Sequence, residues 1–329
     1  MALLQSKGIH LIGSVVVLPT ETTDNLDLSF LNQEAKENFI KHTGIRYRRI
    51  AKKEDRIEAY FDKGISEILD DLQWDVNEIQ VLICVSQTPS TKFPSMANQL
   101  HANWKMTSSC LCFDINLGCS GFVYGLQLVS QLLNGFSEKN VKALLCCGDF
   151  SSRIIQKNDS ATEPIFSDGI SVTAIEKLPL FSEWFFHLES ISSGVDAIKY
   201  DLDKGAMELN GIDVFQHSVQ FVPKNLYSLF SFADIHQEKI DYFILHQANR
   251  LINQSIAKKL QCNIERFPSS IEQFGNTSSA SIPLTLILQQ NETSSGEATY
   301  CFCGFGVGFS IGSVLLKMPP LKLAKCVDF

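Results

Sequence analysis

Residues 110–126, CLCFDINLGCSGFVYGL, place a short apolar strand, a cysteine between glycines and an apolar helix in direct succession. The first seven residues have the length and composition of a buried strand, and the run from Gly121 to Leu133 has those of an apolar helix. Gly118 and Gly121 flank Cys119, so the chain can turn sharply there at little steric cost. A strand, tight turn and helix in this order is the building unit of an α/β fold.

Cys119 is a candidate nucleophile because of its place at the start of that helix. The positive end of the helix dipole and the unpaired N–H groups there favour the thiolate, which is the nucleophilic form of cysteine. An inert cysteine buried at a strand–helix junction explains this segment equally well.

The same alternation of apolar strands and helices extends outward from residues 110–126 and predicts a parallel sheet with helices on both faces. In the first half we expect strands at 8–18, 81–85, 110–116 and 141–147 and helices at 55–72, 95–104 and 121–133. In the second half we expect strands at 184–191, 241–245, 298–303 and 308–316, and helices within 207–232 and at 248–260 and 278–290. Two halves of similar size, residues 1–176 and 177–329, suggest an internal duplication.

Composition narrows the class of protein. The formal net charge of −8 argues against a nucleic-acid-binding protein, which usually presents a basic face. No segment reaches the roughly 20 apolar residues of a membrane span, and the N-terminus lacks the pattern of a signal peptide. The ten cysteines lie mostly in apolar runs, which suggests reduced, buried thiols and no zinc site. We therefore expect a cytoplasmic protein.

Three further segments carry residue types suited to catalysis, and each also has a structural explanation. His246 follows the apolar strand 241–245, at the end of a strand where α/β sheets bind ligands, although a single histidine is more often structural. Asn276 lies in GNTSSA before a helix, where it could equally be a helix cap. The glycines of 304–308, GFGVG, let backbone N–H groups approach a ligand, or simply form a turn.

Taken together, these segments resemble ketoacyl-acyl-carrier-protein synthase III and its relatives in the thiolase superfamily. The matching segments are collinear over nearly the whole chain: 43–49 (TGIRYRR), 93–95 (FPS), 114–122 (DINLGCSGF), 167–169 (SDG), 210–215 (NGIDVF), 246–249 (HQAN) and 275–281 (GNTSSAS). The resemblance implies an α/β, thiolase-like fold of duplicated halves in five layers, α-β-α-β-α, and a homodimer.

The resemblance also implies catalytic roles. Cys119 would carry an acyl group taken from acyl-CoA or an acyl carrier protein. His246 and Asn276 would bind the carbonyl of a malonyl thioester and stabilise the enolate left by decarboxylation. No cofactor or metal is implied. Thiolases use a second cysteine instead of the asparagine, so the Cys-His-Asn set separates this chain from them.

Several residues around these three take roles from the same resemblance. The loop of Phe305, Gly306 and Val307 would close the active site, with the N–H groups of Cys119 and Val307 as an oxyanion hole. Phe93 would cross the dimer interface to line the partner's acyl pocket.

The chain departs from the family where substrates dock. Members that start from acetyl-CoA have a tryptophan and an arginine that hold adenine, and the aligned residues are Asn38 and His42. The remaining cations that could meet CoA phosphates or an acidic carrier protein are Arg46, Arg49, Arg250, Lys258 and Lys259, with Arg250 displaced by one position. These departures weaken the case for a small acyl-CoA starter.

The leading hypothesis is therefore a decarboxylating Claisen condensation that gives a β-ketoacyl product in fatty acid or specialised polyketide or lipid synthesis. One alternative is an acyltransferase on the same fold that forms an ester or amide without releasing CO2. Another is a partner subunit of a heterodimeric synthase. The sequence does not name the acyl chain or the donor.

Overall fold

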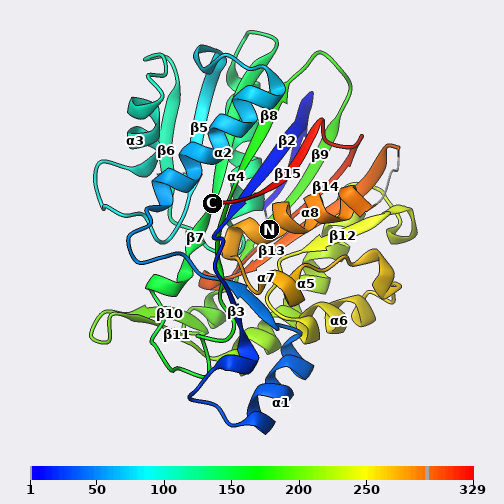
Figure 1. The fold of residues 1–329 in the computed structure, drawn as a ribbon. Coiled ribbons are helices and arrows are strands. Elements are labelled where there is room, and N and C mark those ends of the chain that lie inside the picture. The colour runs from blue at the N-terminus through cyan, green and yellow to red at the C-terminus, as the bar shows by residue number, and fades with distance from the viewer. Residues whose placement is uncertain (1, 293–295) are drawn as a thin grey trace.

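Two sheets form the centre of the computed structural model, which describes residues 2–292 and 296–329 (Figure 1). The six-stranded sheet has the order β15-β2-β8-β7-β5-β6 and the five-stranded sheet the order β1-β9-β14-β13-β12. The first sheet consists of β2 (Ile9–Leu18), β5 (Ile79–Val85), β6 (Leu111–Ile115), β7 (Val141–Phe150), β8 (Asp168–Lys177) and β15 (Leu323–Asp328). The second consists of β1 (Ala2–Lys7), β9 (Glu183–Ser190), β12 (Tyr242–Leu245), β13 (Ala298–Gly306) and β14 (Ser310–Met318).

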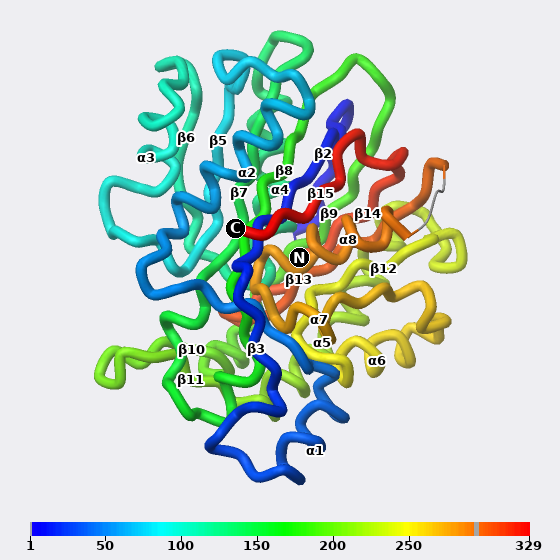
Figure 2. Tube along the Cα trace, viewed as in Figure 1, coloured from blue at the N-terminus to red at the C-terminus, as the bar shows by residue number. Residues whose placement is uncertain are grey.

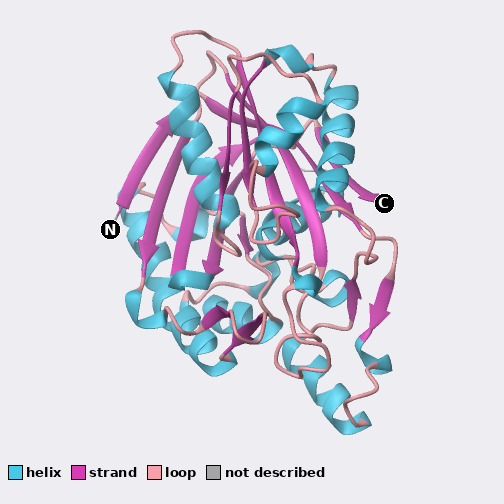
Figure 3. Cartoon of the chain, turned by 90° about the vertical axis from the view of Figure 1, so that its left-hand side faces the viewer, coloured by secondary structure: helices cyan, strands magenta, loops and turns pink. Residues whose placement is uncertain are grey.

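Helices cover both faces of each sheet. The helices are α1 (Gln33–Thr43), α2 (Ile57–Leu72), α3 (Met96–Asn103), α4 (Gly121–Gly135), α5 (Gly211–Phe232), α6 (Arg250–Lys259), α7 (Ile271–Phe274) and α8 (Ser281–Glu292). Helices α4 and α8 contact strands of both sheets, whereas α2 and α3 pack on the first sheet and α5 packs on the second. Figure 3 shows helices between and outside the two sets of strands. The expected α-β-α-β-α layering is confirmed.

Two small antiparallel sheets of two strands each complete the fold: β3 (Thr22–Asp24) with β4 (Tyr47–Arg49), and β10 (Ile198–Asp201) with β11 (Ala206–Leu209).

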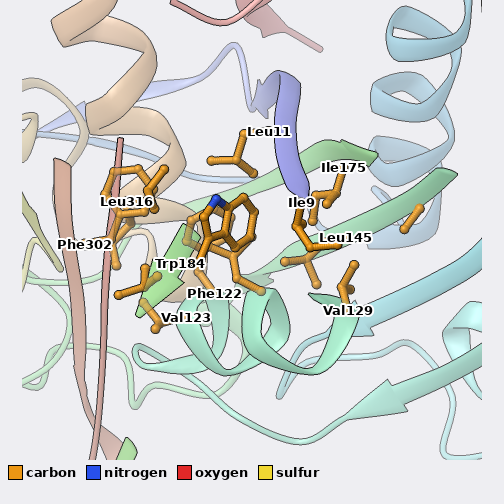
Figure 4. Packing of buried hydrophobic residues seen from close by; sticks show 14 of the residues in the cluster. Ile9, Leu11, Phe122, Val123, Val129, Leu145, Ile175, Trp184, Phe302 and Leu316 are labelled. Atoms are coloured by element: carbon orange, nitrogen blue, oxygen red, sulfur yellow. The ribbon is translucent and has the colours of Figure 1, made fainter. Parts of the chain in front are cut away.

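Helix α4 lies in the middle layer because it is apolar on most of its circumference. Phe122 and Val123 lie in one core cluster with Phe302 of β13 and Trp184 of β9, while Val129 of the same helix packs toward the first sheet (Figure 4). A helix that is hydrophobic all round is one that is buried on all sides. This packing holds the start of α4, and with it Cys119, between the two sheets.

The expectation of a parallel sheet was wrong for several strands. Pairs β5–β6, β5–β7, β15–β2 and β12–β13 are parallel, but β7–β8, β2–β8, β13–β14, β14–β9 and β1–β9 are antiparallel. Parallel neighbours need a crossover connection, usually a helix. Only a single 3-10 turn occurs between β7 and β8, so the chain returns antiparallel.

Each terminal strand joins a different sheet from the strand next to it in the sequence. Strand β1 pairs with β9 in the second sheet, and β15 pairs with β2 in the first. The blue β2 and red β15 run side by side in Figure 2, and Figure 3 places the two termini on opposite sides of the molecule. The sequence pattern missed β15, because its half-buried alternation is short. The division into halves at residues 176 and 177 stays a prediction.

The ten cysteines are free thiols, seven of them buried. Among the described residues, no helix has the length and apolar character of a membrane span.

Candidate active site

Cys119 lies at the junction of β6 and α4, and its side chain is 6% exposed. The end of β13 packs directly against it. A β-carbon at Gly304 would lie 2.7 Å from the Cys119 carbonyl oxygen, and one at Gly306 would lie 3.1 Å from Sγ. The two glycines therefore allow β13 to approach the cysteine closely. Their role is more than the formation of a turn.

The environment of Cys119 does not favour an isolated thiolate. Burial and, to a smaller extent, the negative charge of Asp149 raise the pKa of the thiol to about 12, although hydrogen bonds from the backbone and from Ser278 favour the thiolate. The expectation that the helix start would lower this pKa was therefore wrong. In this fold the cost of burying the charge is larger than the effect of the helix dipole.

His246 directly follows β12, as the sequence indicated, and is 1% exposed. Its Nδ1 lies 2.7 Å from Oγ of Ser281, the first residue of α8. Burial lowers the pKa of the imidazole to about 3, with the Ser278 backbone opposing, so the ring is neutral near pH 7. In the tautomer that accepts the Ser281 proton on Nδ1, Nε2 carries a proton and can donate to a substrate oxygen.

Asn276 is held by the loop between α7 and the 3-10 turn η7 (Ser278–Ala280). Its Oδ1 accepts a hydrogen bond from the Ser278 N–H at 2.9 Å, which leaves the two Nδ2 protons for another acceptor. Ser278 has a φ of 51°, a left-handed conformation that is uncommon outside glycine. Because its groups also act on Cys119 and His246, Ser278 joins all three candidate residues.

A small enclosed cavity of about 10 Å³ lies beside Cys119, with Asp149, Ser278 and Val307 in its wall. Such a volume holds about one water molecule. Gln87, Ile154 and Val307 also line a neighbouring groove of about 830 Å³, which Lys92, Arg153 and Tyr200 border. The reacting centre is thus enclosed, and the larger space for a substrate begins beside it.

The three residues of the 305–307 loop lie at the site, whereas Phe93 lies at the surface. Phe305, 1% exposed, sets its ring 5.6 Å from the His246 ring in an edge-to-face arrangement, and Gly306 touches Cys119. Val307 lines the small cavity. Phe93 is 84% exposed, away from these contacts.

The candidate phosphate-binding cations differ in their surroundings. Arg46 pairs with Asp24, Arg49 with Asp328 and the Pro19 carbonyl, and Arg250 with Glu272. Lys258 and Lys259, at the end of α6, are exposed and have no ion pair within the described residues. The two lysines are therefore the cations of this set that are available to a partner.

Three residues beside Cys119 and His246 were missed from the sequence: Asp149, Ser278 and Ser281. Asp149 is the penultimate residue of a buried apolar strand, and a carboxylate near the carboxyl end of such a strand is a signal that could have singled it out. Ser281 was quoted within GNTSSAS, but its contact with His246 crosses 35 residues of sequence and only the fold reveals it.

Comparisons with known proteins agree along the whole chain. A sequence profile described as 3-oxoacyl-[acyl-carrier-protein (ACP)] synthase III matches residues 113–190, and the profile of its C-terminal part matches 230–318. A beta-ketoacyl-[acyl-carrier-protein] synthase III of Acholeplasma laidlawii is 30% identical, over 96% of this chain and 100% of the relative. The corresponding protein of Streptococcus mutans is also 30% identical, over 92% and 96%.

Solved structures give the same result. The crystal structure of a 3-oxoacyl-(acyl-carrier protein) synthase from Burkholderia xenovorans superimposes with a TM-score of 0.94 at 28% identity, covering 100% of this chain and 99% of that one. The priming beta-ketosynthase of the R1128 polyketide pathway, at 20% identity and a TM-score of 0.87 over 96% and 97%, shares the fold.

Proposed function

Since the chain belongs to the β-ketoacyl-acyl-carrier-protein synthase III family of condensing acyltransferases, we propose that Cys119 carries the acyl group and condenses it with a malonyl thioester. The observation that supports these roles most directly is the position of Ser278, whose N–H is bound by Asn276 and whose hydroxyl and backbone act on Cys119 and His246 respectively. The product is a β-ketoacyl thioester for fatty acid or polyketide synthesis.

The first half-reaction is acyl transfer to sulfur. The Cys119 sulfur attacks the donor's thioester carbonyl, the new C–S bond forms, and the donor thiol leaves with a proton. The N–H groups of Cys119 and Val307 stabilise the oxyanion of the tetrahedral intermediate, as the contact between β13 and the start of α4 supports.

The second half-reaction begins with loss of CO2 from the malonyl thioester. His246 and Asn276 donate hydrogen bonds to its carbonyl oxygen, where negative charge develops as the enolate forms. Burial keeps the imidazole of His246 neutral. A neutral N–H group stabilises the enolate oxygen by a hydrogen bond and does not transfer its proton to it. The enolate carbon then attacks the acyl carbonyl on Cys119 and expels the thiolate.

The partners follow from the same proposal. The exposed Lys258 and Lys259 suit an acidic acyl carrier protein, which would bring the malonyl group, and acyl-CoA or acyl carrier protein is the donor. A homodimer is supported by Phe93, 84% exposed, and by Leu111, 46% exposed, on β6 at the unpaired edge of the first sheet. The protein works in the cytoplasm without a metal or other cofactor.

Intact-protein mass spectrometry tests the proposal. Wild type and Cys119→Ala are mixed with panels of acyl-CoA and acyl-carrier-protein donors, and then with malonyl-carrier protein. We expect an acyl adduct on wild type alone, whose mass names the starter, and then its loss together with CO2 release and a β-ketoacyl product.

Two variants assign the second half-reaction. His246→Ala and Asn276→Ala should still form the adduct but lose condensation by at least about 10²-fold, because each removes an enolate donor. An adduct that passes to an alcohol or amine without CO2 would identify an acyltransferase instead. No adduct with any donor would contradict the proposal.

A further inference from the structure

Asp149, the penultimate residue of β7, has no role in the reaction as described, yet it lies in the wall of the small cavity with Cys119. The side chain is 1% exposed. Its Oδ1 accepts three hydrogen bonds, from the Gln87 N–H at 2.6 Å, Ser86 Oγ at 3.0 Å and Thr88 Oγ1 at 3.2 Å. These donors fix the orientation of the carboxylate.

The second oxygen is different. Oδ2 is fully buried and makes no hydrogen bond of standard geometry with the described residues. A buried carboxylate oxygen without a hydrogen bond of good geometry costs free energy, so its retention in the wall of a cavity beside a thiol needs an explanation. Oδ2 is therefore available to accept a proton.

Ser278 lies in the wall of the same small cavity as Asp149 and Cys119. Its hydroxyl lowers the pKa of Cys119 and also that of Asp149, partly offsetting the larger rise that burial causes in each. The N–H of Ser278 is held by Asn276 Oδ1 at 2.9 Å, which fixes the serine in its left-handed conformation between the two groups.

We infer that Asp149 is the proton acceptor for Cys119 and that the Ser278 hydroxyl relays the proton between them during acyl transfer. As sulfur bonds to the donor's carbonyl carbon, the thiol proton passes to Ser278 while the Ser278 proton passes to Asp149. When the carbon–sulfur bond of the donor breaks, the departing thiolate takes the proton back by the same route. Atoms and charge balance, and no outside base is needed.

The charges around the cavity fit this role. The titratable groups that face Asp149 are the thiols of Cys119 on the opposite side and of Cys147 on its own strand, and none of the cavity residues is a cation. Two negative charges cannot be buried together at acceptable cost. One negative charge therefore moves from Asp149 to Cys119, which makes the thiolate accessible despite a thiol pKa of about 12.

The inference rests on the proposed acyl-carrying role of Cys119, so its test measures that thiol without any acyl donor. Iodoacetamide labelling of the Cys119 peptide is timed by mass spectrometry between about pH 6 and about pH 9. The proteins are wild type, Asp149→Asn, Ser278→Ala and the control Asp62→Asn. Asp62, which accepts the Trp104 indole N–H at 2.9 Å, lies outside the cavity.

With Asp149 as internal acceptor, the proton that leaves Cys119 stays within the protein, so forming the thiolate releases no proton to water. Wild type and the control should therefore be labelled at rates nearly independent of pH. Asp149→Asn and Ser278→Ala must lose the proton to water, so their rates should rise about tenfold per pH unit and be at least about 10²-fold lower at pH 7. Ser278→Ala keeps the hydrogen bonds to Asp149 Oδ1, so it remains informative if Asp149→Asn folds poorly.

Two results would overturn the relay. If the carboxylate only repels the thiolate, Asp149→Asn reacts faster at pH 7 with an unchanged slope. If Ser278 is not in the path, Ser278→Ala keeps the wild-type profile. Acylation by the donor panel then reports separately on the condensing function, so the two proposals fail independently.

Discussion

At the scale of single residues, the chemistry of this protein depends on environments more than on residue types. Cys119, His246 and Asn276 were all recognisable in the sequence. Burial then raises the pKa of the thiol and lowers that of the imidazole, which reverses the expectation from the helix dipole for Cys119. The polar groups that the structure places beside Cys119 and His246, namely Asp149, Ser278 and Ser281, come from three different elements.

The lowered pKa of His246 predicts a loss of stability in acid. Below about pH 6.5 the unfolded chain binds a proton at this residue, but the folded chain does not until about pH 3. The free energy of unfolding should therefore fall by up to about 1.4 kcal/mol per pH unit from this residue as the pH drops through that window. Denaturant unfolding of wild type and His246→Gln from about pH 7 to about pH 4 measures it.

In His246→Gln this part of the pH dependence should disappear. The control His236→Gln changes a histidine whose side chain is 70% exposed, and it should keep the wild-type slope. Equal slopes in all three proteins would mean that the imidazole is not held neutral by burial.

At the scale of elements, the site is made by the approach of β13 to the start of α4. Gly304 and Gly306 allow that contact, and β12 with α8 brings His246 and Ser281 to the same place. The sequence predicted most of these strands and helices from their periodicity. The approach itself could not be predicted, since it depends on the contact of residues nearly 190 positions apart.

Substituting Gly306 tests that contact. A β-carbon would lie 2.9 Å from the Cys119 β-carbon, and the glycine has a φ of 156°. We expect Gly306→Ala to lower the free energy of unfolding by about 1–3 kcal/mol and to slow Cys119 alkylation at least about tenfold.

The matched control is Gly135→Ala at the end of α4, where nothing lies within 4 Å of the added carbon. It should leave alkylation unchanged and stability the same or up to about 1 kcal/mol higher. Thermal unfolding and timed labelling measure both, and wild-type behaviour of Gly306→Ala would show that β13 can move aside.

At the scale of the whole molecule, the two sheets are tied together by the chain ends. Strand β15 runs beside β2, Lys325 pairs with Glu67 and Asp71, and the Phe329 ring lies 4.8 Å from Tyr60. The middle helices α4 and α8 also contact both sheets. We therefore expect the fold to unfold as one unit.

Removing residues 320–329 should destabilise the entire fold. The loss uncovers β2 as a new sheet edge and removes the Tyr60 contact, so we expect a decrease of at least about 2 kcal/mol and self-association. Thermal unfolding and light scattering measure both effects. The surface control Leu202→Ser, 88% exposed, should match wild type, and a truncated chain as stable as that control would contradict the structural role of β15.

The sequence by itself determined the alternation of strands and helices, the family and the three central candidate residues, because periodicity and short motifs are local properties of the chain. Only the tertiary structure decided the strand directions, the exchange of β1 and β15 between the sheets, and the placement of Asp149 and Ser278 around Cys119. These depend on contacts between distant residues. Burial adds a desolvation cost that changes the pKa of each group, and no local pattern carries that information.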